Sequence, residues 1–93
     1  MALPLDFDWH DGKAASNQTK HGVSFEDARQ VFLDPRRIDV DASRAVDGEE
    51  RRKTTGLMAG KLLSVVYAPR GNVVWIISAR RANPKEIRSY VQS

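Results

Sequence analysis

The chain has 93 residues, which suits one domain with a modest hydrophobic core, and we expect that domain to span residues 1–93. It contains no cysteine, which excludes disulfides and thiolate chemistry. Its net charge of +3 is unevenly spread: residues 1–50 carry six basic and eleven acidic side chains, a balance of −5, and residues 51–93 carry nine and one, a balance of +8. The basic half favours an anionic partner, either nucleic acid or an acidic protein.

The N-terminal residues Met1–Asp6 lack the basic stretch and the long apolar run of a signal peptide. The apolar runs further along the chain are much shorter than the ~20 residues that cross a membrane. We therefore expect a soluble, cytoplasmic protein. From Leu5 to Trp9, apolar and acidic residues alternate, which predicts a strand with one buried face.

Two helices are predicted to follow this strand. Asp11 is a suitable N-cap for a short polar helix over residues 13–20. Ser24 is a suitable N-cap for a second helix, whose apolar residues recur at helical spacing. Asp34-Pro35 is expected to end that helix, because the residue before a proline avoids the helical conformation.

Four strands and a last helix are predicted in the rest of the chain. The strands are expected over residues 38–41, 51–57, 62–67 and 73–78, and Asn83 is expected to cap the helix. The continuous apolar runs of the last two strands predict central positions that are covered on both faces. The order β-α-α-β-β-β-β-α predicts a small α+β fold, in which two N-terminal helices and a C-terminal helix pack on an antiparallel or mixed sheet.

No metal site is predicted. His10 and His21 are the only histidines, they lie on separate elements, and no pair of ligands has the spacing of a zinc or iron site. Asp39 and Asp41 share one strand face, where a solvated acidic edge is a better interpretation than a magnesium site. We therefore expect neither a metal nor a cofactor.

The first helix carries a polar face that could contact RNA. Lys13, Asn17, Lys20 and His21 fall on one helical face by their spacing. A solvated surface is the ordinary interpretation of such a face, and RNA contact is the functional one. A second polar group is Glu49-Glu50-Arg51 ahead of a strand, which is interpreted either as a structural ion pair or as a base and a cation beside a phosphate.

A third polar group lies where the last apolar strand ends. Arg80 and Arg81 follow that strand directly, and alternation along it places them on opposite faces of the sheet. A guanidinium at such a position matches the geometry of a phosphate. Glu86 in the next helix is expected to stabilise the helix start or to pair with an arginine, and Tyr90 is either an aromatic at the edge of the core or a proton donor.

These motifs together resemble a BrnT-type toxin of a type II toxin–antitoxin module. The resemblance covers nearly the whole chain, in order and with matching spacing. It is carried by Trp9-x3-Lys13-x3-Asn17-x2-Lys20-His21-Gly22-Val23-Ser24-Phe25-Glu26, Val31-Phe32-x-Asp34-Pro35, Gly48-Glu49-Glu50-Arg51, and Ile76-Ile77-Ser78-Ala79-Arg80-Arg81-Ala82-x3-Glu86-x3-Tyr90. The chain departs from the family pattern at His10, where aspartate is usual, at Ala68, where a hydroxyl residue is common, and at Asn83-Pro84, which replaces a threonine.

The resemblance implies a RelE-like fold and a metal-independent ribonuclease that inhibits translation and growth. It also implies neutralisation by a cognate BrnA-type antitoxin, a DNA-binding protein whose complex with the toxin represses their operon. The alternative is a non-catalytic partner-binding module that co-represses transcription together with a DNA-binding protein. The charge division between the two halves of the chain is compatible with either function.

Cleavage without a metal requires a base for the ribose 2′-hydroxyl, a cation for the phosphate and an acid for the 5′ oxygen. Glu50 or His21 is expected to be the base, and His21 or Tyr90 the acid. Arg80 and Arg51 are expected to meet the charge that builds on the phosphate. The remaining basic side chains are expected to hold the RNA backbone without reading its sequence, and they are Lys13, Lys20, Arg81 and Arg88.

Overall fold

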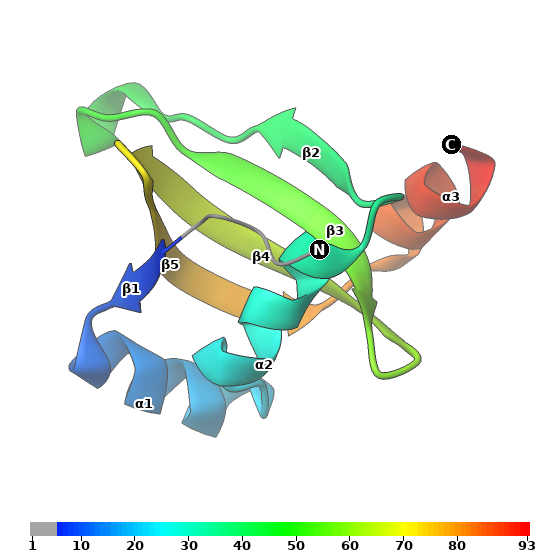
Figure 1. Ribbon diagram of the computed structural model, residues 1–93, viewed down its shortest axis with the longest axis horizontal. Coiled ribbons are helices and arrows are strands. Elements are labelled where there is room, and N and C mark those ends of the chain that lie inside the picture. The colour runs from blue at the N-terminus through cyan, green and yellow to red at the C-terminus, as the bar shows by residue number, and fades with distance from the viewer. Residues whose placement is uncertain (1–5) are drawn as a thin grey trace.

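A five-stranded mixed sheet organises the computed structural model, which describes residues 6–93 (Figure 1). The strands lie in the order β1-β5-β4-β3-β2, and β1 alone runs parallel to its neighbour. Their bounds are β1 Asp6–Trp9, β2 Ile38–Asp41, β3 Arg52–Met58, β4 Lys61–Arg70 and β5 Val73–Arg81. The predicted α+β class with a mixed sheet is therefore confirmed. The predicted first strand began at Leu5, which lies outside the described residues.

Three α-helices accompany the sheet, and they are α1 (Asp11–His21), α2 (Phe25–Arg29) and α3 (Pro84–Gln92). The second is only five residues long and continues as the 3₁₀ helix η1 (Gln30–Leu33), so the second N-terminal helix is much shorter than predicted. Figure 1 shows α1 and α2 together on one side of the sheet, with α3 apart from them.

Local capping signals explain where these helices begin. Ser24 and Asn83 cap α2 and α3, as predicted. Ser24 accepts a hydrogen bond from the backbone N–H of Asp27, and Asn83 forms a reciprocal capping box with Glu86 that was not predicted. The first helix differs, because its cap is His10 rather than Asp11. The Nδ1 atom of His10 accepts from the N–H of Lys13 at 3.2 Å, so the histidine that departs from the family pattern takes the capping role.

The hydrophobic core lies between the sheet and the layer formed by α1, α2 and η1, and we call this side of the sheet the helix face. Phe25, Val31 and Phe32 contribute the helical side of the core, and Leu63, Val65 and Ile76 are among the strand residues that they meet. No residue of α3 belongs to this cluster. The opposite side, which we call the open face, is covered only in part. Val66 and Trp75 remain half-buried there, so the prediction that both central strands are covered on both faces is wrong for this side.

A β-bulge in β5 decides which face each of its last residues occupies. Tyr67 pairs with Ile76 and Val66 pairs with Ser78, so Ile77 has no partner on β4. The extra residue shifts the alternation by one place, and for this reason Ile76 and Ala79 are both buried in the core although they are three positions apart. Arg80 and Arg81 then lie on opposite faces, as alternation predicts, but the bulge determines which arginine lies on which face.

Asn17 extends the sheet where β1 ends. The strand β1 stops at Trp9, opposite Ile76, and leaves the next part of β5 without a neighbour on that edge. The side chain of Asn17 donates to the backbone oxygen of Ala79 at 2.8 Å and accepts from its N–H at 3.1 Å. The same amide also donates to the oxygen of Val23 at 2.9 Å, and Asn17 is buried. Asn17 therefore replaces a missing strand and is not available for RNA contact.

Candidate nucleic-acid interface

A group of basic side chains that form no ion pair with another described residue lies along α1 and beside the adjoining ends of β4 and β5. We call it the basic strip, and it consists of Lys13, Lys20, His21, Lys61 and Arg81. None of the lysines or arginines in it forms an ion pair with another described residue, whereas most other arginines of the chain do. Cations that are not neutralised within the protein are available to contact phosphates.

His21 lies between the two halves of the basic strip. It lines a cleft of about 210 Å³ together with Lys13 and Lys20, and a second cleft of about 140 Å³ together with Lys61 and Arg81. One carboxylate, that of Asp27, lines the second cleft. His21 is half-buried at the last position of α1. The structure therefore places a group able to transfer protons between cations from α1 and cations from the sheet.

The cations that the strands present on the open face, and Arg51 beside them, are arranged differently, because each of them is paired with a carboxylate. Arg51, which precedes β3, pairs with Asp47 of the 3₁₀ helix η2 (Ala45–Asp47). Arg70 forms a two-pronged pair with Glu49, and its guanidinium lies over the ring of Trp75 at 4.6 Å. The carboxylates of these pairs all come from segments outside the sheet. They neutralise cations that lie on the strands or, for Arg51, directly before a strand.

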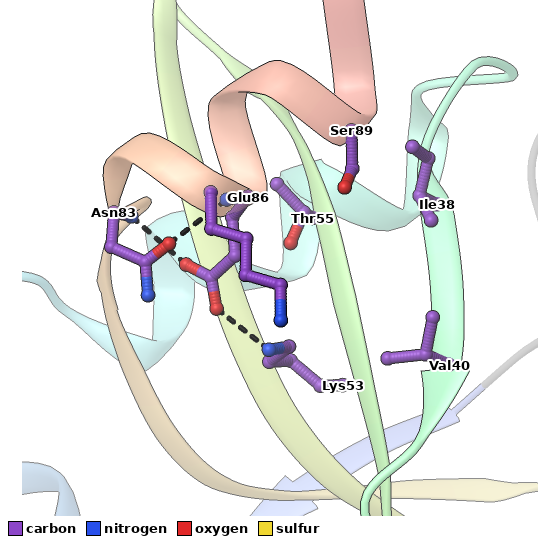
Figure 2. A pocket seen from close by; sticks show the side chains of 8 residues that line it. Ile38, Val40, Lys53, Thr55, Asn83, Glu86 and Ser89 are labelled. Carbon is purple, nitrogen blue, oxygen red and sulfur yellow. Dashed lines mark hydrogen bonds and ion pairs between the residues drawn. The ribbon is translucent and has the colours of Figure 1, made fainter. Parts of the chain in front are cut away.

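Arg80 takes part in a pair whose carboxylate, that of Glu86, is only 7% exposed. Its Nη1 and Nη2 atoms each donate to one oxygen of Glu86 at 2.8 Å, and Nζ of Lys53 lies 2.7 Å from the same carboxylate. The N–H of Asn83 adds a fourth donor at 2.9 Å. Figure 2 shows the contacts of Lys53 and Asn83 at the wall of a cleft of about 300 Å³, between α3 and the strands β2 and β3. The interpretation of Glu86 as a partner for an arginine is therefore confirmed.

The pairing of Glu86 predicts a dependence of stability on pH. Burial alone would raise the pKa of Glu86, but hydrogen bonds from Arg80 and Lys53 outweigh burial and hold the pKa well below its ordinary value of 4.5. A lowered pKa in the folded state means that the carboxylate stabilises the fold fully above pH 4.5 and that this contribution is lost as the pH falls below it. We expect Glu86→Gln to show a smaller loss of Tm between pH 6 and pH 3 than the wild type, measured by circular dichroism. Equal losses in both proteins would contradict this role.

The structure does not bring all of the expected site residues together. Lys13, Lys20, His21 and Arg81 share the basic strip, whereas Arg51 and Arg80 lie on the open face. Glu50 is exposed two residues before β3, where it pairs with Arg52 at 3.3 Å. The hydroxyl of Tyr90 donates to Asp34 at 2.6 Å and attaches α3 to the turn after η1. Arg88 is exposed on α3.

Three residues that border these surfaces were not predicted from the sequence. Lys61 completes the basic strip, Lys53 is the second cation on Glu86, and Trp75 offers a half-buried ring on the open face. Lys53 and Lys61 are single lysines within or beside apolar strands, and no local pattern marks them. The ring of Trp75 follows from strand alternation with Arg70, once the two strands are known to pair.

Within residues 6–93 no group of three or more histidine and acidic side chains is arranged to hold a metal ion. Among the same residues, no helix is both long and apolar enough to cross a membrane. A small α+β domain with an unpaired basic surface beside a histidine has the composition of a nucleic-acid-processing protein.

The comparison with protein families names the class more closely. Residues 9–86 match the model of the family described as the ribonuclease toxin, BrnT, of the type II toxin–antitoxin system. The match covers most of the chain, so the protein belongs to the BrnT family of ribonuclease toxins. Membership of a type II toxin–antitoxin family implies an antitoxin partner and an RNA target. The search of curated proteins found no match.

Proposed function

We propose that this protein is an endoribonuclease that cleaves RNA without a metal, that its fold is RelE-like, and that the basic strip is its RNA-binding site. The observation that supports the site most strongly is the position of His21 between two clefts lined by unpaired cations. Lys13 and Lys20 on one side and Arg81 on the other can hold successive phosphates of a strand. This use of backbone contacts selects RNA by its charge and not by its bases.

In the proposed reaction, the imidazole of His21 accepts the proton of a ribose 2′-hydroxyl. The 2′ oxygen then forms a bond to the adjacent phosphorus, and the bond from phosphorus to the 5′ oxygen breaks. Water protonates the 5′ oxygen. The products are a 2′,3′-cyclic phosphate and a 5′-hydroxyl, and the imidazolium returns its proton to solvent. Lys20 and Arg81 stabilise the charge on the phosphate oxygens, and a histidine suits the proton transfer because it exchanges protons near neutral pH.

This proposal changes the roles that were expected for Arg80 and Arg81. Arg80 was expected to meet the charge on the phosphate, but its guanidinium is bonded to Glu86 on the open face, so we give that role to Arg81. Glu50 and Tyr90 remain alternatives for proton transfer only if RNA also reaches the open face. Arg51 and Arg88 would then contact the same strand of RNA from the open face and from α3.

We further propose that the antitoxin is a BrnA-type, DNA-binding protein and that the complex represses its own operon in the cytoplasm. What supports this is the family membership together with the excess of cations in residues 51–93, which suits an acidic partner segment. Operator DNA would then be contacted through the antitoxin.

The experiment that tests the proposed activity is cleavage of a mixed-sequence, single-stranded RNA by the purified protein in excess EDTA. We expect cleavage at the same rate as in magnesium, because no step of the proposed reaction uses a metal ion. A DNA strand of the same sequence should remain intact, because it has no 2′-hydroxyl. Loss of RNA cleavage in EDTA, with recovery in magnesium, would contradict the metal-independent reaction.

A further inference from the structure

The carboxylate of Glu86 is bound in the way that proteins bind a phosphate. A guanidinium fork donates to both of its oxygens, and an ammonium group and a backbone N–H complete the set, all at 2.7–2.9 Å. Planar forks and ammonium groups recognise carboxylates and phosphates by the same geometry. The side chain of Glu86 is only 7% exposed, so little solvent competes for these donors.

The cations of this site belong to the sheet and not to the helix that carries Glu86. Arg80 on β5 lies opposite Ser64 on β4, which lies opposite Thr55 on β3, and Lys53 is two residues from Thr55 on the same strand. The hydroxyls of Ser64 and Thr55 are joined at 2.7 Å and are buried. The donor side chains are therefore fixed by strands that pair along their whole length, and they would stay in place if α3 moved.

α3 itself is attached to the sheet by polar contacts. Only Glu86 and Tyr90 are buried among its residues, and each is held by hydrogen bonds. Its two aliphatic side chains face outward, since Ile87 is 39% exposed and Val91 is 66% exposed. Lifting α3 therefore exposes mainly the ring of Tyr90 and breaks its hydrogen bond to Asp34, whereas the ion pairs of Glu86 are exchanged, not lost, if another anion takes its place.

We propose that Arg80 and Lys53, with Ser64 between them, form a phosphate-binding site that Glu86 occupies in the free protein, and that α3 lifts to admit a backbone phosphate of RNA. The assignment to RNA rests on the proposed function, whereas the affinity for phosphate does not. This site lies on the open face, whereas Arg81 and His21 lie on the helix face. It is therefore separate from the basic strip.

The first test measures Tm of Glu86→Ala in phosphate and in chloride at equal ionic strength. We expect phosphate to raise the Tm of this variant by about 5 °C more than that of the wild type, because the anion refills the vacated site. Glu26→Ala is the matched control, since it also removes one carboxylate and one ion pair, from α2. The double variant Arg80→Ala/Glu86→Ala should lose the effect. Equal shifts in Glu86→Ala and Glu26→Ala would overturn the phosphate site.

The second test uses a 2′-O-methyl RNA oligonucleotide, which binds but cannot be cleaved, so it is independent of the activity at His21. If α3 is docked in at least about nine molecules of ten, Glu86→Ala should bind the oligonucleotide about tenfold more tightly than the wild type. Adding the oligonucleotide to the wild type should also speed hydrogen exchange in α3, a measurement that needs no variant to fold. Phosphate stabilisation with unchanged oligonucleotide affinity and unchanged exchange would show a site for free phosphate only and would overturn the assignment to RNA.

Discussion

His21→Ala is expected to lower the rate of RNA cleavage by about 10²–10⁴-fold, the usual contribution of a general acid or base. The loss follows from the position of His21 between the two clefts of the basic strip. Among the described residues that line these clefts, no second histidine could replace it. The fold should remain intact, because His21 is half-buried at the last position of α1 and lies outside the core. Single-turnover cleavage of a labelled RNA measures the rate, and circular dichroism checks the fold.

The matched control is His10→Ala at the other end of the same helix. His10 caps α1 through the N–H of Lys13, so its removal should cost about 1 kcal/mol of stability while cleavage continues. The two histidines therefore separate a chemical role from a structural one. A His21→Ala protein that cleaves at the wild-type rate would remove His21 from the reaction.

Asn17→Ala is expected to produce the largest loss of stability, about 3 kcal/mol, equivalent to a fall in Tm of roughly 15 °C for a domain of this size. The alanine would leave the N–H and the oxygen of Ala79 and the oxygen of Val23 without their partner in a buried region. Unsatisfied backbone groups are costly when water cannot reach them. Urea denaturation of the purified variant measures the free energy of unfolding.

Gln18→Ala tests whether position on α1 alone explains such a loss. Gln18 follows Asn17 directly and is exposed, so its replacement should change stability by less than about 0.5 kcal/mol. Similar losses in the two variants, or a small loss in Asn17→Ala, would contradict the role of Asn17 as a substitute for a strand.

Local signals in the sequence predicted most of the elements correctly. The caps at Ser24 and Asn83 could be predicted because each bonds to a backbone N–H three residues further along, within the reach of a sequence pattern. Four of the strands, β1, β2, β4 and β5, follow from alternation or from apolar runs, whereas β3 carries neither signal. The short length of α2 was not predicted, because the apolar spacing of Val31 and Phe32 fits a 3₁₀ turn as well as an α-helix.

The candidate site was predicted less completely, because its geometry depends on contacts between distant residues. The bulge at Ile77 has no sequence signal, yet it places Arg81 beside His21 and Arg80 beside Glu86. Asn17 bonds to Ala79, which is 62 positions away, so its polar side chain was interpreted as part of an RNA-binding face. Tyr90 similarly meets Asp34 across 56 positions, and neither contact could be inferred from spacing along one element.

The basic strip and the strand cations of the open face thus differ in whether carboxylates neutralise them. On the helix face, the basic strip is unpaired and open to an anion, whereas on the open face the carboxylates of Asp47, Glu49 and Glu86 neutralise the cations. The net charge of +3 does not describe this difference. If the proposed RNA site is correct, the helix face should attract RNA first, and the open face should bind RNA only when its carboxylates move away.

The most direct test of metal-independent cleavage through the 2′-hydroxyl compares two RNA strands in EDTA. The cleavage positions in a mixed-sequence RNA are mapped first, and a second strand then carries a single 2′-deoxynucleotide immediately before a mapped position. We predict that the wild-type protein leaves this position intact, still cleaves the others, and yields 2′,3′-cyclic phosphate ends. Unchanged cleavage at the 2′-deoxy position, or products that carry a 5′-phosphate, would contradict attack by the 2′-hydroxyl.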